Sequence, residues 1–181
     1  MAKLNEKNDI TKKIIHLMIT DKCDRKCPDC CNNQYDIWNT VDRVTPEELK
    51  EAETIFLTGG EPFAYSDPTL IAKGLKCTYP NIKKVYVYTN AYELLVDWIL
   101  LERNLDCIDG LTISVKSGKD VMSMSAINRN KEIRKMAEKG NIRIYVFEGY
   151  ESVITLELFD RRKRVWQKDF IPAPDSIFRR L

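Results

Sequence analysis

The sequence predicts an α/β protein that forms an open, partial barrel of the TIM type, with five or six mostly parallel strands. Short β-branched runs alternate with helical segments along the chain, and this alternation favours a parallel sheet with helices outside it. Polar residues follow the strands at the points where they end, which is where ligands bind in such sheets. Six strands over residues 14–159 are too few to close an eight-stranded barrel.

Length and composition indicate a single globular domain. The chain has 181 residues, of which 44% are hydrophobic and 31% charged, with a net charge of +2; this balance argues against a general nucleic-acid binder. No apolar run approaches the roughly 20 residues of a membrane span, and no signal-peptide pattern is present. We therefore expect a cytoplasmic protein without a membrane partner. It divides into an N-terminal extension (1–12), the barrel (13–159) and a basic C-terminal extension (160–181).

The first predicted strand, residues 14–20, is too short and too rich in β-branched residues for a helix. We expect His16, within it, to lie in the interior or the barrel wall; a role near the substrate is the alternative. A polar loop follows at once and carries Cys23, Cys27 and Cys30. Thiols this close together in a cytosolic chain indicate metal or redox chemistry.

The three thiols alone leave two kinds of site open. An iron–sulfur cluster with full cysteine ligation takes four thiolates, so three would leave one iron open to a substrate or cofactor. Structural zinc also takes four ligands. Cys31 is poorly suited as the fourth ligand because neighbouring side chains point apart, and His16 lies within the strand.

The second strand-and-turn unit is preceded by a short helix. This helix, expected over residues 45–52, begins with a capping box of Thr45 and Glu48 and has proline at its first position. The strand, residues 54–58, runs into a turn made of Gly59, Gly60, Glu61 and Pro62. Two glycines at a strand end permit a sharp turn and the close approach of a ligand. The turn is therefore expected to form a polar shelf, with a plain turn as the alternative.

The third strand, residues 84–89, ends in Thr89 and Asn90. Asn90 and Glu93 are expected to cap a helix over residues 91–103. This helix carries an apolar stripe at helical spacing, which we assign to the core: Leu94, Leu95, Trp98, Ile99 and Leu101.

The remaining predicted elements are a helix starting at residues 66–68, a strand over 111–115, a helical region over 119–139 closed by Gly140, and strands over 142–147 and 153–159. Ser114, Lys116 and Gly118 accompany the end of the fourth strand, and Glu148 follows the fifth. Five polar groups therefore fall on one edge of the sheet. From residue 160 onwards the pattern breaks down, and residues 160–181 contain seven basic and three acidic residues (7 − 3 = +4). A solvated surface is the favoured interpretation, and a docking patch for an acidic partner or a phosphate-bearing substrate is the alternative.

Two motifs together resemble those of the radical S-adenosylmethionine (SAM) superfamily. They are Cys-x3-Cys-x2-Cys directly after the first strand and Leu-Thr-Gly-Gly-Glu-Pro (57–62) at the end of the second. The resemblance implies that Cys23, Cys27 and Cys30 hold an oxygen-sensitive [4Fe–4S] cluster whose open iron binds SAM. It implies reductive cleavage of SAM to methionine and a 5′-deoxyadenosyl radical that abstracts hydrogen from the substrate.

The resemblance also implies where SAM is held. The turn at residues 59–62 would bind its amine, Ser114 and Lys116 match the position that holds its ribose or carboxylate, and residues 146–148 would lie by its adenine. Thr89 and Asn90, on the same edge, are included among the cofactor-binding residues. The chain departs from the family in having Asp29 where an aromatic residue is frequent.

Tyr35 or Trp38 is the expected replacement for that aromatic contact. Cys31 is interpreted as structural or incidental, and no second cluster is expected from the isolated cysteines, Cys77 and Cys107.

The substrate class stays open at this point. Residues 111–116 are similar to strand four of small enzymes that rearrange a pterin-like substrate into a deazapurine, which favours a small-molecule or nucleoside-like substrate. Residues 27–32 look like those of glycyl-radical enzyme activases, whose protein partner would seal an open barrel. A non-catalytic iron–sulfur or zinc-binding protein is the remote alternative. The family implies a reductant such as flavodoxin or ferredoxin, and a homodimer stays open.

Overall fold

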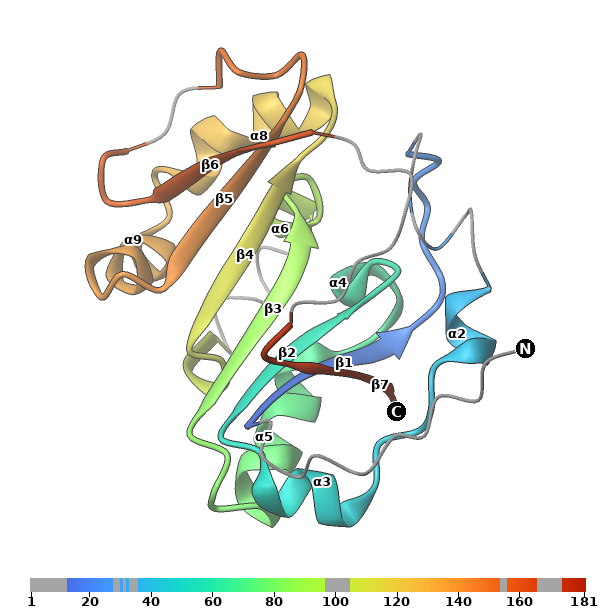
Figure 1. Cartoon of the computed structure of the whole chain (residues 1–181). Coiled ribbons are helices and arrows are strands. Elements are labelled where there is room, and N and C mark those ends of the chain that lie inside the picture. Colours follow the sequence, from blue (N-terminus) through green and yellow to red (C-terminus); the bar gives the residue numbers. More distant parts are fainter. Residues whose placement is uncertain are drawn as a thin grey trace.

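The protein is described here from a computed structural model, for residues 13–27, 30, 32, 36–96, 105–153, 156–165 and 174–181. One sheet of seven parallel strands runs through these residues in the order β6-β5-β4-β3-β2-β1-β7 (Figure 1). The two end strands, β6 and β7, do not pair with each other, so the sheet stays open. The predicted α/β class and the open parallel sheet are confirmed, with seven strands instead of five or six.

The first five strands agree with the predicted ones to within one residue. All seven are β1 (Ile14–Thr20), β2 (Thr54–Gly59), β3 (Lys84–Asn90), β4 (Gly110–Val115), β5 (Ile142–Phe147), β6 (Asp160–Arg164) and β7 (Ile177–Arg180). Every second residue of β1, β2 and β3 is an aliphatic side chain buried in the core, and this alternation is typical of a strand. This is why a local pattern was sufficient to predict them.

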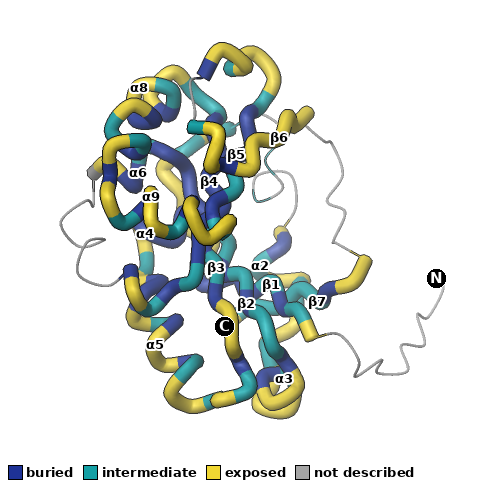
Figure 2. The backbone as a smooth tube through the Cα atoms, turned by 90° about the vertical axis from the view of Figure 1, so that its left-hand side faces the viewer, coloured by how far each residue is buried: buried dark blue, intermediate teal, exposed yellow. Residues whose placement is uncertain are grey.

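The predicted sixth strand at residues 153–159 is wrong. Val153 and Phe159 are buried in the core from the turns that precede β6, so their apolar character reflects packing; residues 154–155 lie outside the described residues. The strand itself is β6, whose five residues are all exposed (Figure 2). The predicted C-terminal extension thus supplies β6 and β7, the two outermost strands of the sheet.

The helices are α2 (Ile37–Thr40), α3 (Pro46–Glu51), α4 (Pro62–Tyr65), α5 (Pro68–Thr78), α6 (Glu93–Val96), α8 (Gly118–Ile127) and α9 (Lys131–Glu138), with a 3₁₀ turn η1 (Leu105–Cys107). The predicted capping box is present in α3. The predicted region 119–139 is two helices, because Asn130 caps α9 by accepting a hydrogen bond from Ile133 N (2.9 Å). Of the predicted helix 91–103, residues 97–103 lie outside the described residues. Among the described helices, none has the length and apolar character needed to cross a bilayer.

The two faces of the sheet have different side chains. Helices α4, α5, α6, α8 and α9 lie on one face (Figures 1 and 2), over a largely aliphatic core. The opposite face carries a set of stacked rings, with centroids 4.9 Å apart for His16 and Phe56 and 5.1 Å apart for Phe56 and Tyr86. We call this side of the sheet the aromatic face; its ring set is His16, Phe56, Tyr86, Tyr88 and Phe178.

Candidate functional site

The segment that carries Cys23, Cys27 and Cys30, called here the cysteine loop, crosses the glycine turn at the carboxyl end of β2. Gly60 N donates to Thr20 O (2.8 Å) and Glu61 N donates to Lys22 O (2.9 Å). A Cβ on Gly60 would lie 1.9 Å from Lys22 O, and Gly59 has a φ of +123°. Both glycines are therefore required by the chain itself, because the close approach predicted for a ligand is made here by the cysteine loop.

The three thiols are accessible and near one another. Cys23 is exposed, and Cys27 and Cys30 are half-buried. Burial raises the pKa of Cys27; Lys116 lowers it, whereas Cys30 raises it further. Burial likewise raises the pKa of Cys23, and Cys27 is among the negative neighbours that add to this rise.

The donor set fits an iron–sulfur cluster. Three thiols on one accessible loop match the chemistry of a cluster with three protein ligands and one open iron. Within the part of the chain that the structure describes, no three His, Cys, Asp or Glu side chains are already placed around one metal position.

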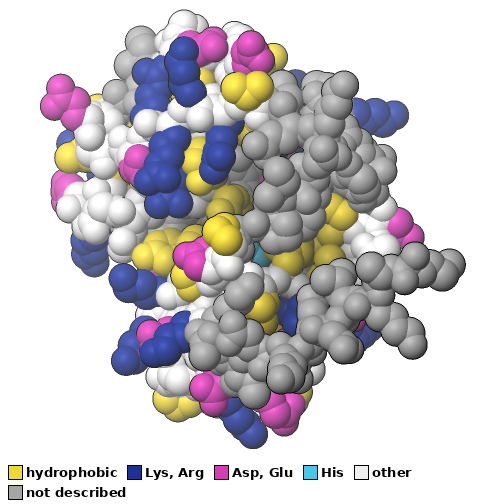
Figure 3. Space-filling view, in the orientation of Figure 1, with side chains coloured by type: hydrophobic (Ala, Val, Ile, Leu, Met, Phe, Trp, Pro, Cys, Tyr) yellow, Lys and Arg dark blue, Asp and Glu magenta, His cyan; other side chains and the backbone are white. Residues whose placement is uncertain are grey.

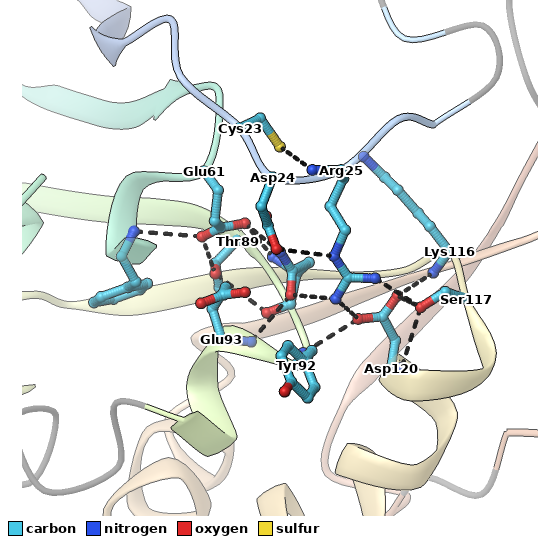
Figure 4. Close-up of polar contacts among 12 residues, drawn as sticks. Cys23, Asp24, Arg25, Glu61, Thr89, Tyr92, Glu93, Lys116, Ser117 and Asp120 are labelled. Atoms are coloured by element: carbon cyan, nitrogen blue, oxygen red, sulfur yellow. Dashed lines mark hydrogen bonds and ion pairs between the residues drawn. The ribbon is translucent and has the colours of Figure 1, made fainter. Parts of the chain in front are cut away.

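Glu61 of the glycine turn is a buried carboxylate whose hydrogen-bond donors are neutral, with Glu93 as a nearby acidic residue (Figure 4). It is 3% exposed. It accepts hydrogen bonds from Thr89 Oγ1 (2.6 Å), Asn90 N (2.9 Å), Asn90 Nδ2 (2.7 Å) and Phe63 N (3.3 Å). Burial raises the pKa of Glu61 to about 7, although these hydrogen bonds oppose the rise. The predicted site residues Thr89 and Asn90 thus bind the predicted site residue Glu61.

Asp120, near the start of α8, is a second buried carboxylate on the same edge. Its side chain is fully buried. It accepts hydrogen bonds from Tyr92 N (3.2 Å), Lys116 N (3.0 Å), Ser117 Oγ (2.7 Å) and the guanidinium of Arg25 (3.2 Å). Buried charges in proteins are generally paired, and Arg25 supplies the pairing cation here.

Arg25 connects the cysteine loop to the end of β3 and the start of α8. Besides binding Asp120, its guanidinium donates to Ser117 Oγ (2.8 Å) and Asn90 Oδ1 (3.2 Å) (Figure 4). It also lies over the ring of Tyr92, 5.4 Å from the centroid. The sequence analysis missed Arg25 and Asp120. A lone arginine between cysteines carries no local signal of a partner 95 residues away.

The other predicted cofactor-binding residues lie on the same edge. Ser114 is buried on β4, between Asn90 on β3 and Tyr145 on β5. The ammonium of Lys116 lies 5.1 Å from the ring centroid of Phe147. Pro62 is buried in the first turn of α4.

Several other predicted positions lie elsewhere. His16 lies within β1, in the ring set of the aromatic face, and burial lowers its pKa. The guanidinium carbon of Arg180 lies over the ring of Trp38, 5.7 Å from its centroid. Cys77 and Cys107 precede the amino ends of β3 and β4, at the opposite edge of the sheet. Asp29, Cys31 and Tyr35 are outside the described residues.

No protein-family model matches the sequence, and a search of curated proteins returned no match. The function is therefore inferred from the motifs and from the geometry of the carboxyl edge.

Proposed function

We propose that the protein is a radical SAM enzyme in which Cys23, Cys27 and Cys30 hold a [4Fe–4S] cluster. Such a cluster, when bound and reduced by a partner such as flavodoxin or ferredoxin, supplies the electron that cleaves SAM to methionine and a 5′-deoxyadenosyl radical, which removes a hydrogen atom from the substrate. The proposed substrate is a small or nucleoside-like molecule.

The observation that carries the proposal is the pair of hydrogen bonds between the cysteine loop and the glycine turn, from Gly60 N to Thr20 O and from Glu61 N to Lys22 O. They bring the two motifs together at the carboxyl edge of the sheet, where ligands of α/β proteins bind. A cofactor at the cysteine loop would therefore lie beside the turn that is proposed to bind the amine of SAM.

The surrounding residues have distinct proposed roles. Arg25 and Asp120 orient the cysteine loop through contacts to the end of β3 and the start of α8. Glu61 keeps the glycine turn in place through Thr89 and Asn90. Ser114 and Lys116 are proposed to bind the ribose or carboxylate of SAM.

The alternative substrate is a protein, as for a glycyl-radical enzyme activase. The feature that favours it is the open sheet, because its outermost strands, β6 and β7, do not pair with each other. A protein partner could cover the opening between these two strands. Recovery of a glycyl-radical enzyme with the protein, together with formation of its glycyl radical on mixing, would select this alternative.

The proposal is tested by reconstituting the full chain with iron and sulfide under anaerobic conditions, reducing it with dithionite and adding SAM. We expect 5′-deoxyadenosine to form. Cys27→Ala should abolish both the brown colour of the cluster and the product. Cys77→Ala, which removes an exposed thiol of α5 far from the loop, is the matched control and should keep both.

Two results would refute the proposal. One is a protein with an intact, reduced cluster that releases no 5′-deoxyadenosine. The other is a protein that assembles no iron–sulfur cluster and instead retains one zinc ion that depends on the same cysteines.

A further inference from the structure

Three arginines gather on the aromatic face at its β5–β6 side. The register pairs Arg143 with Asp160, Tyr145 with Arg162 and Phe147 with Arg164. Because side chains alternate along a strand, Arg143, Arg162 and Arg164 lie on the same face of the sheet. We call these three arginines the basic corner. Lys and Arg side chains gather over β6 in Figure 3, above the hydrophobic side chains of the central strands.

The charge of the basic corner is only partly balanced. Asp160 accepts a hydrogen bond from Arg143 Nε (3.1 Å) and pairs with Arg162 (2.8 Å). Arg164 has no carboxylate within ion-pair distance among the described residues; its guanidinium lies 4.2 Å from the ring centroid of Tyr145. Three arginines and one carboxylate leave 3 − 1 = +2. Arginine forks of this kind bind carboxylate and phosphate groups bidentately.

Tyr88 connects the basic corner to the stacked rings. Its centroid is 5.8 Å from that of Phe56 and 5.9 Å from that of His16. Burial raises the pKa of Tyr88 to about 12, and the nearby charges of Arg143 and Arg164 act in the opposite direction. The half-buried Tyr88 and Phe56, whose rings are tilted by 49°, thus form an aromatic surface next to the cations against which a planar ring can stack.

Lys116 connects the basic corner to the cysteine loop. Its ammonium lies over the ring of Phe147, the residue that pairs with Arg164 across β5 and β6. The backbone N of Lys116 donates to Asp120 (3.0 Å), the carboxylate that also binds Arg25 of the cysteine loop (3.2 Å). A ligand on the basic corner would therefore lie beside the loop that is proposed to hold the cluster.

We propose that the aromatic face binds a small substrate that combines a planar ring with a carboxylate or phosphate group, the anion at Arg162 and Arg164 and the ring over Tyr88 and Phe56. This rests on the proposed function, because it assigns the substrate of the same site.

Charges on β6 also have a structural use, since basic residues on an edge strand discourage edge-to-edge pairing. This protection against pairing does not depend on which face of β6 carries the charges. Arg161 and Lys163 pair with Ile144 and Val146 and so lie on the opposite face of β6. The two faces of one strand therefore supply a test variant and a control of equal charge.

The test is calorimetric titration of the full-length, cluster-reconstituted protein without SAM. The probes are 2-naphthoate, 2-naphthyl phosphate and the neutral 2-naphthol, with inorganic phosphate as the anion alone. At least one naphthyl anion should bind about tenfold more tightly than 2-naphthol, and the preferred anion identifies carboxylate or phosphate. Arg164→Gln should weaken that binding about tenfold, as expected for loss of a charge-assisted hydrogen bond. Lys163→Gln should leave it unchanged within twofold.

Tyr88→Ala should weaken the charged and neutral naphthyl probes alike and leave the binding of inorganic phosphate unchanged. Equal affinity for the anions and 2-naphthol would overturn the inference. So would equal effects of Arg164→Gln and Lys163→Gln, or a second copy of the chain that occupies the face, seen as a dimer that Arg164→Gln dissociates. Binding needs no turnover, so a failure to form 5′-deoxyadenosine counts against the proposed function only.

Discussion

Glu61 and Asp120 are buried carboxylates on the same edge of the sheet, yet the chain satisfies them in different ways. Asp120 is paired with the guanidinium of Arg25, which the cysteine loop brings from 95 residues away. Glu61 accepts hydrogen bonds only from neutral groups of Phe63, Thr89 and Asn90 among the described residues. A cation offsets the cost of burying charge more fully than neutral donors do.

Because of this difference, the two carboxylates affect the stability of the fold in different ways. Asp120 connects the position of the cysteine loop to the stability of the fold, because the ion pair exists only when the loop is in place. Glu61 connects the glycine turn to pH, since burial raises its pKa to about 7. The carboxyl edge of the sheet therefore carries one contact, at Asp120, that depends on the position of the cysteine loop and another, at Glu61, that depends on pH.

The largest effect is expected from Asp120→Ala. Removing one partner of a buried ion pair leaves the other unpaired and costs about 3–5 kcal/mol, and Tyr92 N and Lys116 N also lose their acceptor. Urea unfolding of the full chain measures this loss. The control is Asp24→Ala, because Asp24 is an exposed neighbour 4.0 Å from the same arginine and its loss should cost at most about 0.5 kcal/mol. Equal losses would show that Arg25 does not depend on Asp120.

A smaller effect is expected from Gly60→Ala, which separates the loop from the turn. The new Cβ would lie 1.9 Å from Lys22 O, a backbone atom that cannot move without displacing the cysteine loop. We expect a loss of about 3 kcal/mol, at the upper end for overpacking. Gly74→Ala is the matched control, because a Cβ in α5 meets nothing within 4 Å and alanine favours a helix by up to about 1 kcal/mol. Similar stability of both variants would contradict the close crossing of loop and turn.

The smallest effect is the pH dependence due to Glu61. Its pKa of about 7 in the folded protein exceeds the ordinary 4.5, so the folded state binds the proton more tightly than the unfolded state. The resulting stabilisation is fully present below pH 4.5 and is lost as the pH rises through 7. We expect a fall of about 2 kcal/mol between pH 5 and pH 7.

Glu61→Gln should remove this fall, because an amide does not titrate. Urea unfolding at several pH values is the measurement. Glu138→Gln, at an exposed position at the end of α9, should keep the pH dependence of the original protein. A Glu61→Gln profile parallel to that of the original protein would mean that another group titrates.

The central strands and most of the site could be predicted because their signals are local. The strand β1 is a short, largely buried apolar run, and the capping box of α3 lies within four residues. The cysteine loop and the glycine turn each follow a strand directly, and parallel strands place their carboxyl ends together. By contrast, β6 reads Asp-Arg-Arg-Lys-Arg and has no apolar pattern. It is a strand because β5 offers it an edge to pair with.

The sequence by itself determined which groups are available at the edge, namely three thiols at close spacing and a glycine turn. Chain order and strand periodicity act over a few residues and need no knowledge of the partner. Only the tertiary structure decided that Arg25 meets Asp120, that Glu61 meets neutral donors, and that β6 presents Arg162 and Arg164 on the aromatic face. These contacts join segments far apart in the chain, so they depend on how the strands are ordered and registered. That information is absent from any local pattern.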